Sequence, residues 1–187
     1  MLVAAGNGVA LAVRSRIRSL LVPELSLPTV EVHESSKLAV AEYRAEGCFP
    51  EFDRLDVRHE DDFAAYVDQL VTDPRALYDR GLPPMTAMWW IDGSEYLGRV
   101  SIWHRLDGVF VDSGHIGYDI RRSARGRGHA TAMLAAALPV VAGLGIDPAL
   151  VTCRANNTAS QRVIKANGGQ LVEQCGDQLR FRLPTRW

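Results

Sequence analysis

The residues of this chain that most clearly suggest a chemical role form a basic turn. This turn contains two glycines, Gly126 and Gly128. Four arginines are concentrated in the same stretch: Arg121, Arg122, Arg125 and Arg127. The alanine-rich run that follows, residues 131–138, predicts a helix. Glycine lets the backbone approach a ligand closely, and the first turn of a helix offers unpaired N–H groups with a partial positive charge. The stretch therefore predicts a cradle for a phosphate or pyrophosphate.

Two familiar phosphate-binding patterns do not account for this turn. A P-loop requires Lys and then Ser or Thr after its second glycine, but His129 and Ala130 follow Gly128. A dinucleotide fingerprint requires a third glycine, where this chain has Thr131, and an acidic residue that closes a second strand. Asp147 has a suitable spacing but lies before a proline in a predicted loop. The P-loop is therefore excluded, and the dinucleotide fingerprint matches only in part.

A third pattern fits the turn better. Arg125, Gly128 and Ala130 fill the three fixed places of the sequence Q/R-x-x-G-x-G/A. In this hexapeptide the chain resembles the acyl-CoA-binding motif of the GNAT N-acetyltransferase superfamily.

The flanking sequence extends the resemblance. Residues 114–120 resemble the family's strand before the motif. Residues 157–160 and 167–169 resemble the start and the end of the family's next helix, which follows the one that the motif opens. Residues 42–47 and 98–106 resemble a bacterial subgroup of predicted acetyltransferases. The resemblance covers roughly residues 17–183 and implies the GNAT fold.

The resemblance also implies acetyl-CoA as the acyl-donor substrate, without a metal. The donor would lie between the strand that ends at Ile120 and the strand at residues 149–154, which splay apart in this family. Backbone groups of residues 118–120 would pair with the pantetheine, amides of residues 125–131 would hold the pyrophosphate, and Asn157 would contact the pantetheine or order its loop. The implied cofactor-binding residues are Tyr118, Asp119, Ile120, Arg125, Gly126, Arg127, Gly128, His129, Ala130, Thr131, Asn157 and Ser160.

Acyl transfer to an amine needs a neutral amine, stabilisation of the oxyanion and a proton for the departing thiolate. His115 lies at a place where many relatives carry Glu, and a histidine pKa of about 6.5 suits a general base. The alternative is an exposed or hydrogen-bonded strand histidine. The family's usual acid, a Tyr seven residues beyond Asn157, is replaced by Ile164. Water or the hydroxyl of Tyr118 would then supply the proton.

Other residues near the predicted site have simpler structural explanations. The further titratable candidates are Glu31, His104, Asp112 and Asp119. Asp119 alternates onto the opposite face of its strand from Tyr118 and can neutralise the arginines. His129 is expected to cap the helix or to lie beside the phosphate. Cys153 invites a covalent ping-pong scheme, but a small buried residue is the favoured interpretation because no partner His or Asn lies beside it.

The first two predicted helices line the acceptor side in the family. Residues around them that can shape an acceptor pocket are Glu42, Arg44, Glu46, Phe49 and Phe52, with solvated charges and core aromatics as the alternative. The predicted activity is acetyl-CoA-dependent N-acetyl transfer to a primary amine of a small molecule or peptide, by direct attack in a ternary complex. The alternative function is a non-catalytic acyl-CoA-binding or regulatory domain.

Composition restricts the class of protein further. The chain has 187 residues, 47% of them hydrophobic, and a net charge of −1, so nothing favours nucleic acid or membrane partners. Residues 17–187 are expected to form one domain, and residues 1–16 a disordered or weakly structured extension. Cys48, Cys153 and Cys175 form no C-x-x-C pair, which fits a reducing cytoplasm. A homodimer is compatible with exposed strand edges, but no residue pattern specifies one.

The elements that must position these residues follow a simple order. Alternating hydrophobic residues predict strands at residues 17–22, 86–91, 96–106, 114–120, 149–154, 170–174 and 178–183. Helical spacing predicts helices at residues 37–46 and 60–70, from the glycine turn to about residue 143, and at residues 158–166. The order β-α-α-β-β-β-α-β-α-β-β indicates an α+β fold with a mostly antiparallel, splayed central sheet flanked by helices.

Overall fold

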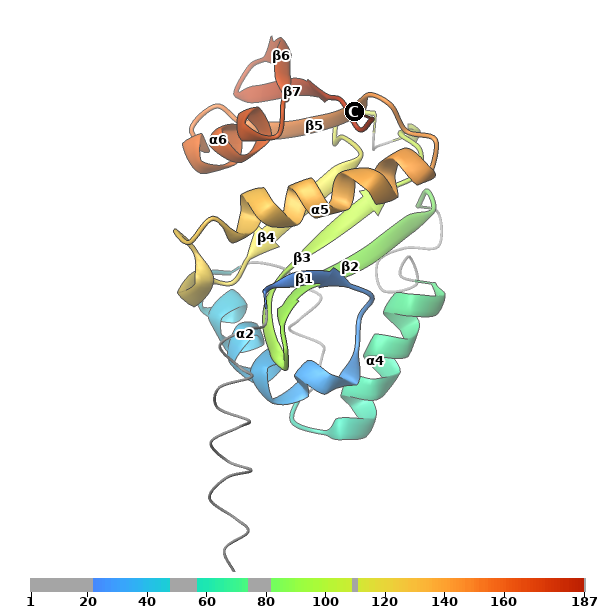
Figure 1. Ribbon diagram of the computed structural model, residues 1–187, viewed down its shortest axis with the longest axis vertical. Coiled ribbons are helices and arrows are strands. Elements are labelled where there is room, and N and C mark those ends of the chain that lie inside the picture. The colour runs from blue at the N-terminus through green and yellow to red at the C-terminus, as the bar shows by residue number, and fades with distance from the viewer. Residues whose placement is uncertain (1–21, 48–56, 74–81, 109–110, 187) are drawn as a thin grey trace, which may run out of the picture.

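Two antiparallel sheets carry the fold in the computed structural model, which describes residues 22–47, 57–73, 82–108 and 111–186 (Figure 1). The first sheet contains, in spatial order, β1 (Glu24–Ser26), β2 (Met85–Asp92), β3 (Glu95–Trp103) and β4 (Ile116–Ile120). The second contains β5 (Ala149–Arg154), β7 (Gln178–Leu183) and β6 (Gln170–Cys175). The predicted α+β class and antiparallel sheet are therefore confirmed.

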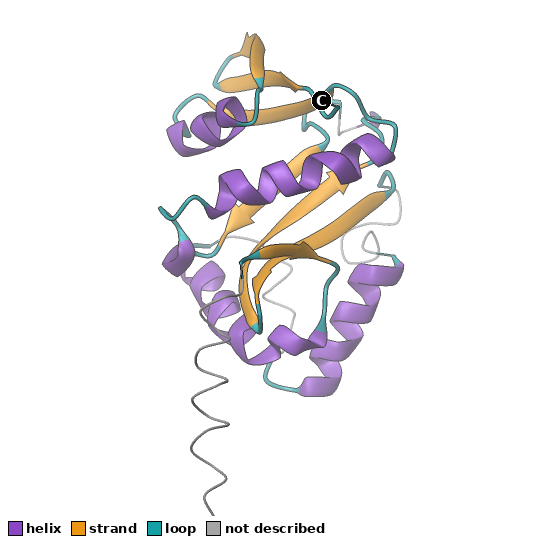
Figure 2. Ribbon diagram, in the orientation of Figure 1, coloured by secondary structure: helices purple, strands orange, loops and turns teal. Residues whose placement is uncertain are grey.

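Helices cover both faces of the first sheet (Figure 2). The described helices are α2 (His33–Ala45), α4 (Glu60–Thr72), α5 (His129–Gly143) and α6 (Thr158–Ala166), with short 3₁₀ turns η1 (Val30–Val32) and η4 (Arg122–Ala124). Alternation along β2 separates two cores: Trp89 packs with α2 and α4, whereas Trp90 packs with α5. None of the described helices is long and apolar enough to cross a membrane.

Helix α5 joins the two sheets into one core. Its fully buried residues, among them Met133, Leu134 and Val141, pack with Val100 of β3 and with Phe181 of β7. Each large apolar side chain buried in this way stabilises the fold by about 1.5–3 kcal/mol. The helix that begins at the glycine turn is therefore anchored along its length, and its first turn is held in a defined place.

The two sheets meet at one narrow junction. Gly114 forms an isolated bridge with Val151, and the backbone N–H of His115 donates to Leu150 O at 2.7 Å. Gly114 has φ +85°, and a Cβ there would lie 2.9 Å from the same carbonyl oxygen, so only glycine fits. Beyond the junction, β4 is paired with β3 and β5 with β7, in separate sheets. The predicted open, splayed sheet is confirmed.

Most predicted elements agree with the structure, and two differ clearly. Helix α2 begins at His33 rather than at residue 37, because the turn η1, whose N-cap is Thr29, runs directly into it. The predicted first strand, residues 17–22, is wrong at Val22, and residues 1–21 lie outside the described residues. The observed β1 occupies the predicted loop because its pairing is set by β2 rather than by its own sequence pattern.

Candidate active site

A groove of about 620 Å³ opens beside the start of α5. Its walls come from the end of β4, the turn η4, the glycine turn and the first half of α6. The lining residues are Tyr118, Asp119, Ile120, Ala124, Arg125, Gly126, Gly128, His129, Ala130, Thr131, Asn157, Ala159, Ser160, Arg162 and Val163. The structure therefore brings all the predicted cofactor-binding residues together except Arg127, and the size suits a small-molecule ligand.

The glycine turn presents backbone amides at this groove. Gly126 and Gly128 have φ values of +77° and +82°, which favour glycine, and no atom lies within 4 Å of a Cβ placed on either. Helix α5 has no side-chain cap, and its first internal hydrogen bond runs from the N–H of Ala132 to Gly128 O at 3.1 Å. The amides before Ala132 consequently have no partner within the helix. An anion in the groove would meet these N–H groups and the positive end of the helix.

His129 contributes a side-chain donor to the same wall. The indole Nε1–H of buried Trp90 donates to His129 Nδ1 at 3.3 Å. In the neutral imidazole the proton then lies on Nε2, so the ring can donate a hydrogen bond there. Sequence reasoning missed Trp90, since it lies on β2 and nothing near it in the sequence marks a contact with the turn.

The opposite wall is ordered by the start of α6. Asn157 caps this helix, because its side-chain oxygen accepts a hydrogen bond from the N–H of Ser160 at 3.0 Å. Asn167, at the other end, donates from Nδ2 to the carbonyl oxygen of Thr131 at 3.2 Å and so ties α6 to the first turn of α5. Of the two roles predicted for Asn157, the ordering of its loop is the one that these contacts support.

Two of the four basic side chains predicted at the cradle point toward α2 instead. Arg121 is 5% exposed, and its Nη2 lies 2.5 Å from Glu42 Oε1. Arg125 donates from both terminal nitrogens to Glu46 at 2.7 Å. Burial raises the pKa of Glu42, but hydrogen bonds from Arg121 and Ser123 outweigh it and hold this pKa at about 2. Glu42 and Glu46 therefore match the charges of two of the four arginines that the sequence concentrates at the predicted cradle.

The same contacts revise the predicted acceptor side. Glu42 and Glu46, which can shape an acceptor pocket or be solvated charges by sequence alone, pair with Arg121 and Arg125 beside the groove. Arg44 is exposed on α2. Phe49 and Phe52 lie outside the described residues.

Asp119 points into the core rather than toward the glycine turn. Its Oδ2 accepts from Arg99 Nε at 3.0 Å, and its Oδ1 accepts a hydrogen bond from the hydroxyl of Tyr43. Burial raises the pKa of Asp119 even though Arg99 opposes the shift. The carboxylate thus pairs with Arg99 of the neighbouring strand, and it also interacts electrostatically with Arg125 of the turn.

Two hydroxyl groups meet on the groove wall. Tyr118 Oη and Ser160 Oγ lie 2.8 Å apart, and burial raises the pKa of Tyr118 to about 12. Cys153 lies close by, is 9% exposed, and has its thiol pKa raised by burial, which disfavours the thiolate that a nucleophile requires. Tyr118 and Ser160 can therefore donate protons, and the small-buried-residue interpretation of Cys153 is favoured.

His115 lies at the junction of the two sheets and does not line the groove. Its Nδ1 accepts a hydrogen bond from the N–H of Leu150 at 3.0 Å, and burial lowers its pKa. A neutral ring that accepts at Nδ1 carries its proton on Nε2 and has no second lone pair to accept another. The geometry thus favours the structural alternative, and the base role of His115 stays a prediction.

The other titratable candidates lie away from the groove. Asp112 pairs with Arg180, His104 Nε2 lies 2.8 Å from Thr86 Oγ1, and Glu31 is exposed in η1. Ile164, in place of the family's acid, is fully buried. Among the described residues no group of three or more His, Cys, Asp or Glu can hold a metal ion.

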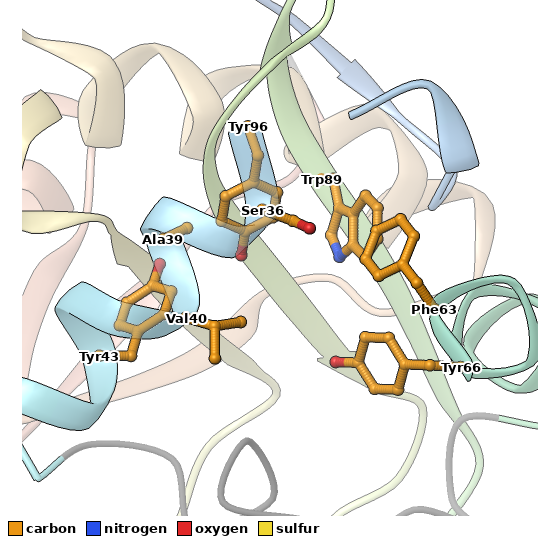
Figure 3. A pocket seen from close by; sticks show the side chains of 8 residues that line it. All are labelled: Ser36, Ala39, Val40, Tyr43, Phe63, Tyr66, Trp89 and Tyr96. Carbon is orange, nitrogen blue, oxygen red and sulfur yellow. The ribbon is translucent and has the colours of Figure 1, made fainter. Parts of the chain in front are cut away.

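A second hollow lies between α2, α4 and the first sheet (Figure 3). It is lined by Ser36, Ala39, Val40, Tyr43, Phe63, Tyr66, Trp89 and Tyr96. Its volume of about 20 Å³ is enough for roughly one water molecule. This aromatic cavity is therefore part of the core and is too small to bind an acceptor.

Solved acetyltransferase structures share this fold. The ribosomal-protein-S5-alanine acetyltransferase from Vibrio fischeri superposes with a TM-score of 0.61 at 12% identity, over 86% of this chain and 92% of that chain. RimL, the ribosomal L7/L12 α-N-protein acetyltransferase in complex with coenzyme A, gives 0.57 at 18% identity, over 86% and 93%. The microcin C7 self-immunity acetyltransferase MccE, in complex with acetyl-CoA and AMP, gives 0.54 at 14% identity, over 86% and 91%. At these identities the similarity establishes the GNAT fold alone.

No curated protein sequence matches the chain. A sequence model of the acetyltransferase (GNAT) domain, however, matches residues 50–170, which is more than half of the chain. This match is independent of the superpositions and includes the glycine turn and all the residues that line the groove. The chain therefore belongs to the GNAT acetyltransferase family.

Proposed function

We propose that this protein transfers an acetyl group from acetyl-CoA to a primary amine of a small molecule or peptide. The observation that carries the proposal is the groove, in which the predicted cofactor residues surround the uncapped start of α5. MccE and RimL were solved with acetyl-CoA and coenzyme A, which supports the same ligand here. RimL and the Vibrio enzyme are named as acetyltransferases of ribosomal proteins, which supports an amine of a peptide as one acceptor class.

Two parts of the groove would bind the donor. The diphosphate would accept hydrogen bonds from the amides between Gly126 and Thr131 and from Nε2 of His129. The pantetheine would lie along Tyr118–Ile120, because β4 is paired with β3 on one edge only over these residues. Its amides would then extend the sheet by one strand.

The transfer itself requires a direct attack. The neutral amine nitrogen adds to the thioester carbonyl carbon, the C–S bond breaks, the thiolate leaves, and the nitrogen passes its surplus proton to water. Burial raises the pKa of Tyr118 to about 12, so its hydroxyl stays protonated at neutral pH. We propose that this hydroxyl, with Ser160 as its partner, donates a hydrogen bond to the departing sulfur. Cys153 takes no part in this scheme.

The decisive experiment measures release of the CoA thiol from acetyl-CoA with a panel of small amines and peptides. We expect turnover only when an amine is present. Tight acetyl-CoA binding with no turnover on any amine would instead favour the non-catalytic domain, an alternative that rests on the buried Ile164 in place of the usual acid.

Replacement of Tyr118 by Phe tests the proton donor. We expect kcat to fall about 100-fold, since general acids contribute about 10²–10⁴-fold, with the KM for acetyl-CoA within about threefold. Cys153→Ala is the matched control on the neighbouring strand and should keep kcat within about threefold of wild type. A loss of activity in the control with full activity in Tyr118→Phe would reverse the two assignments.

Location and assembly are also proposals. The described cysteines, Cys153 and Cys175, are free thiols, which supports a reducing compartment such as the cytoplasm. The exposed strand β6 leaves room for a homodimer.

A further inference from the structure

The turn that leads into the glycines is held from outside by helix α2. Glu42 Oε2 accepts from the backbone N–H of Ser123 at 2.9 Å, and its Oε1 accepts from Ser123 Oγ at 2.9 Å and from Arg121 Nε at 3.1 Å. The 3₁₀ turn η4 has no side-chain cap of its own. Glu42 thus supplies the capping carboxylate from a residue 81 positions earlier in the chain than Ser123.

A second carboxylate, one helical turn further along α2, holds the other end of the same segment. Arg125 forms a two-pronged pair with Glu46, with both N–O distances 2.7 Å. Its remaining nitrogen, Nε, donates to Ile120 O at 2.8 Å and so closes the turn onto the end of β4. Residues 120–125 are therefore fixed at both ends immediately before Gly126.

Charge excludes a direct role for these carboxylates in binding a polyphosphate. Neither Glu42 nor Glu46 lines the groove, and an unpaired carboxylate near it would repel the anionic ligand. Each is instead matched by an arginine, so that the pairs add no net charge beside the groove. The arrangement keeps the segment rigid and leaves ligand contact to the backbone amides.

We infer that Glu42 and Glu46 are positioning residues for the diphosphate cradle, which they hold in its binding geometry before acetyl-CoA arrives. The inference rests on the proposed function. Holding the cradle in advance lowers the ordering cost of binding, so the effect belongs to donor affinity rather than to the transfer step.

The test compares Glu42→Gln, Glu46→Gln and Glu34→Gln with wild type. Glu34 is the matched control, because it lies on the same helix and pairs with Lys37 at 2.7 Å without contact to the turn. Calorimetry with acetyl-CoA should give a Kd about tenfold higher for Glu42→Gln, about threefold higher for the more exposed pair of Glu46, and unchanged for Glu34→Gln. The KM for acetyl-CoA should rise in parallel.

Two further measurements distinguish a positioning role from a general loss of stability. At saturating acetyl-CoA, kcat and the KM for the amine should stay within about twofold of wild type in Glu42→Gln. Amide hydrogen exchange of the free variant should be faster at residues 123–128 and unchanged in β7. Should Glu42→Gln fail to fold, Glu46→Gln decides by the same criteria.

The outcomes separate the two proposals. Wild-type affinity for acetyl-CoA in the glutamate variants would overturn the positioning role and leave the proposed function intact. Failure of the wild-type protein to bind acetyl-CoA would overturn the proposed function, and the positioning role with it.

Discussion

The groove at the start of α5 and the aromatic cavity beneath α2 are two hollows built in different ways. The groove holds about 620 Å³, and one of its walls is the glycine turn, where the positive φ angles of Gly126 and Gly128 set the backbone conformation. The cavity holds about 20 Å³, and its shape follows from the packing of side chains from α2, α4, β2 and β3. Glu42 and Tyr43, neighbours on α2, contact one region each: Glu42 braces the turn beside the groove, and Tyr43 lines the cavity.

The two regions should therefore control different properties of the protein. A site built from backbone groups depends on φ angles and on free N–H groups, so changes there should alter ligand affinity more than stability. A cavity built from packed rings contributes to the core, so changes there should alter the free energy of unfolding more than affinity.

Gly128→Glu should raise the Kd for acetyl-CoA by more than about 100-fold, because it places a negative charge where the diphosphate is expected. Gly176→Glu is the matched control. Gly176 also has a positive φ, +60°, and open space around a Cβ, but it lies in the β6–β7 turn. Calorimetry on both variants checks the prediction. Equal affinities in the two variants would mean that the glycine turn is not the diphosphate site.

Tyr43→Phe should show the opposite behaviour. The variant removes a buried hydrogen bond to Asp119, and we expect the free energy of unfolding to fall by about 1–3 kcal/mol. The Kd for acetyl-CoA should stay within about twofold. Denaturant unfolding and calorimetry measure the two quantities. A large loss of affinity at unchanged stability would remove the distinction between the regions.

His115→Gln tests the junction that joins the two sheets. Burial lowers the pKa of His115 below 6.5, so the unfolded chain takes up the proton first as the pH falls. The wild-type protein should therefore lose stability as the pH drops through about 6.5, and the variant should lose less over that interval. Unfolding at pH 5.5 and pH 8 checks this.

The same variant decides between the two roles of His115. A general base predicts a fall in kcat that shrinks at high pH. The contact with Leu150 leads us to expect a kcat whose pH profile keeps the wild-type shape. If kcat of the variant no longer rises with pH near 6.5 as it does in wild type, His115 would be restored as the base.

Elements with local sequence signals were predicted accurately, and so were the residues of the groove. Strand β5, helix α6 and strand β7 were predicted with their observed bounds, because Asn157, the Asn167–Gly168 stop and hydrophobic alternation are local signals. Strand β1 was misplaced because a three-residue edge strand takes its pairing from β2. The residues of the groove were predicted because one contiguous motif supplies the glycines and the helix start.

The supports of the groove could not be predicted in the same way. Arg121 and Glu42 are 79 residues apart, and nothing in either local pattern indicates the other. The contact between Trp90 and His129 likewise depends on how α5 lies across the sheet. Sequence motifs thus indicated where a ligand would lie, whereas the contacts that hold the motif in place depended on the folded chain.

The pair formed by Arg125 and Glu46 has a consequence for how such proteins diverge. The motif accepts either Arg or Gln at the place of Arg125, and a glutamine has no charge with which to match Glu46. The carboxylate at the place of Glu46 would then be unpaired and would repel an anionic ligand in the groove. Selection is therefore expected to act on these two distant positions as a unit, so that a substitution at one favours a compensating substitution at the other.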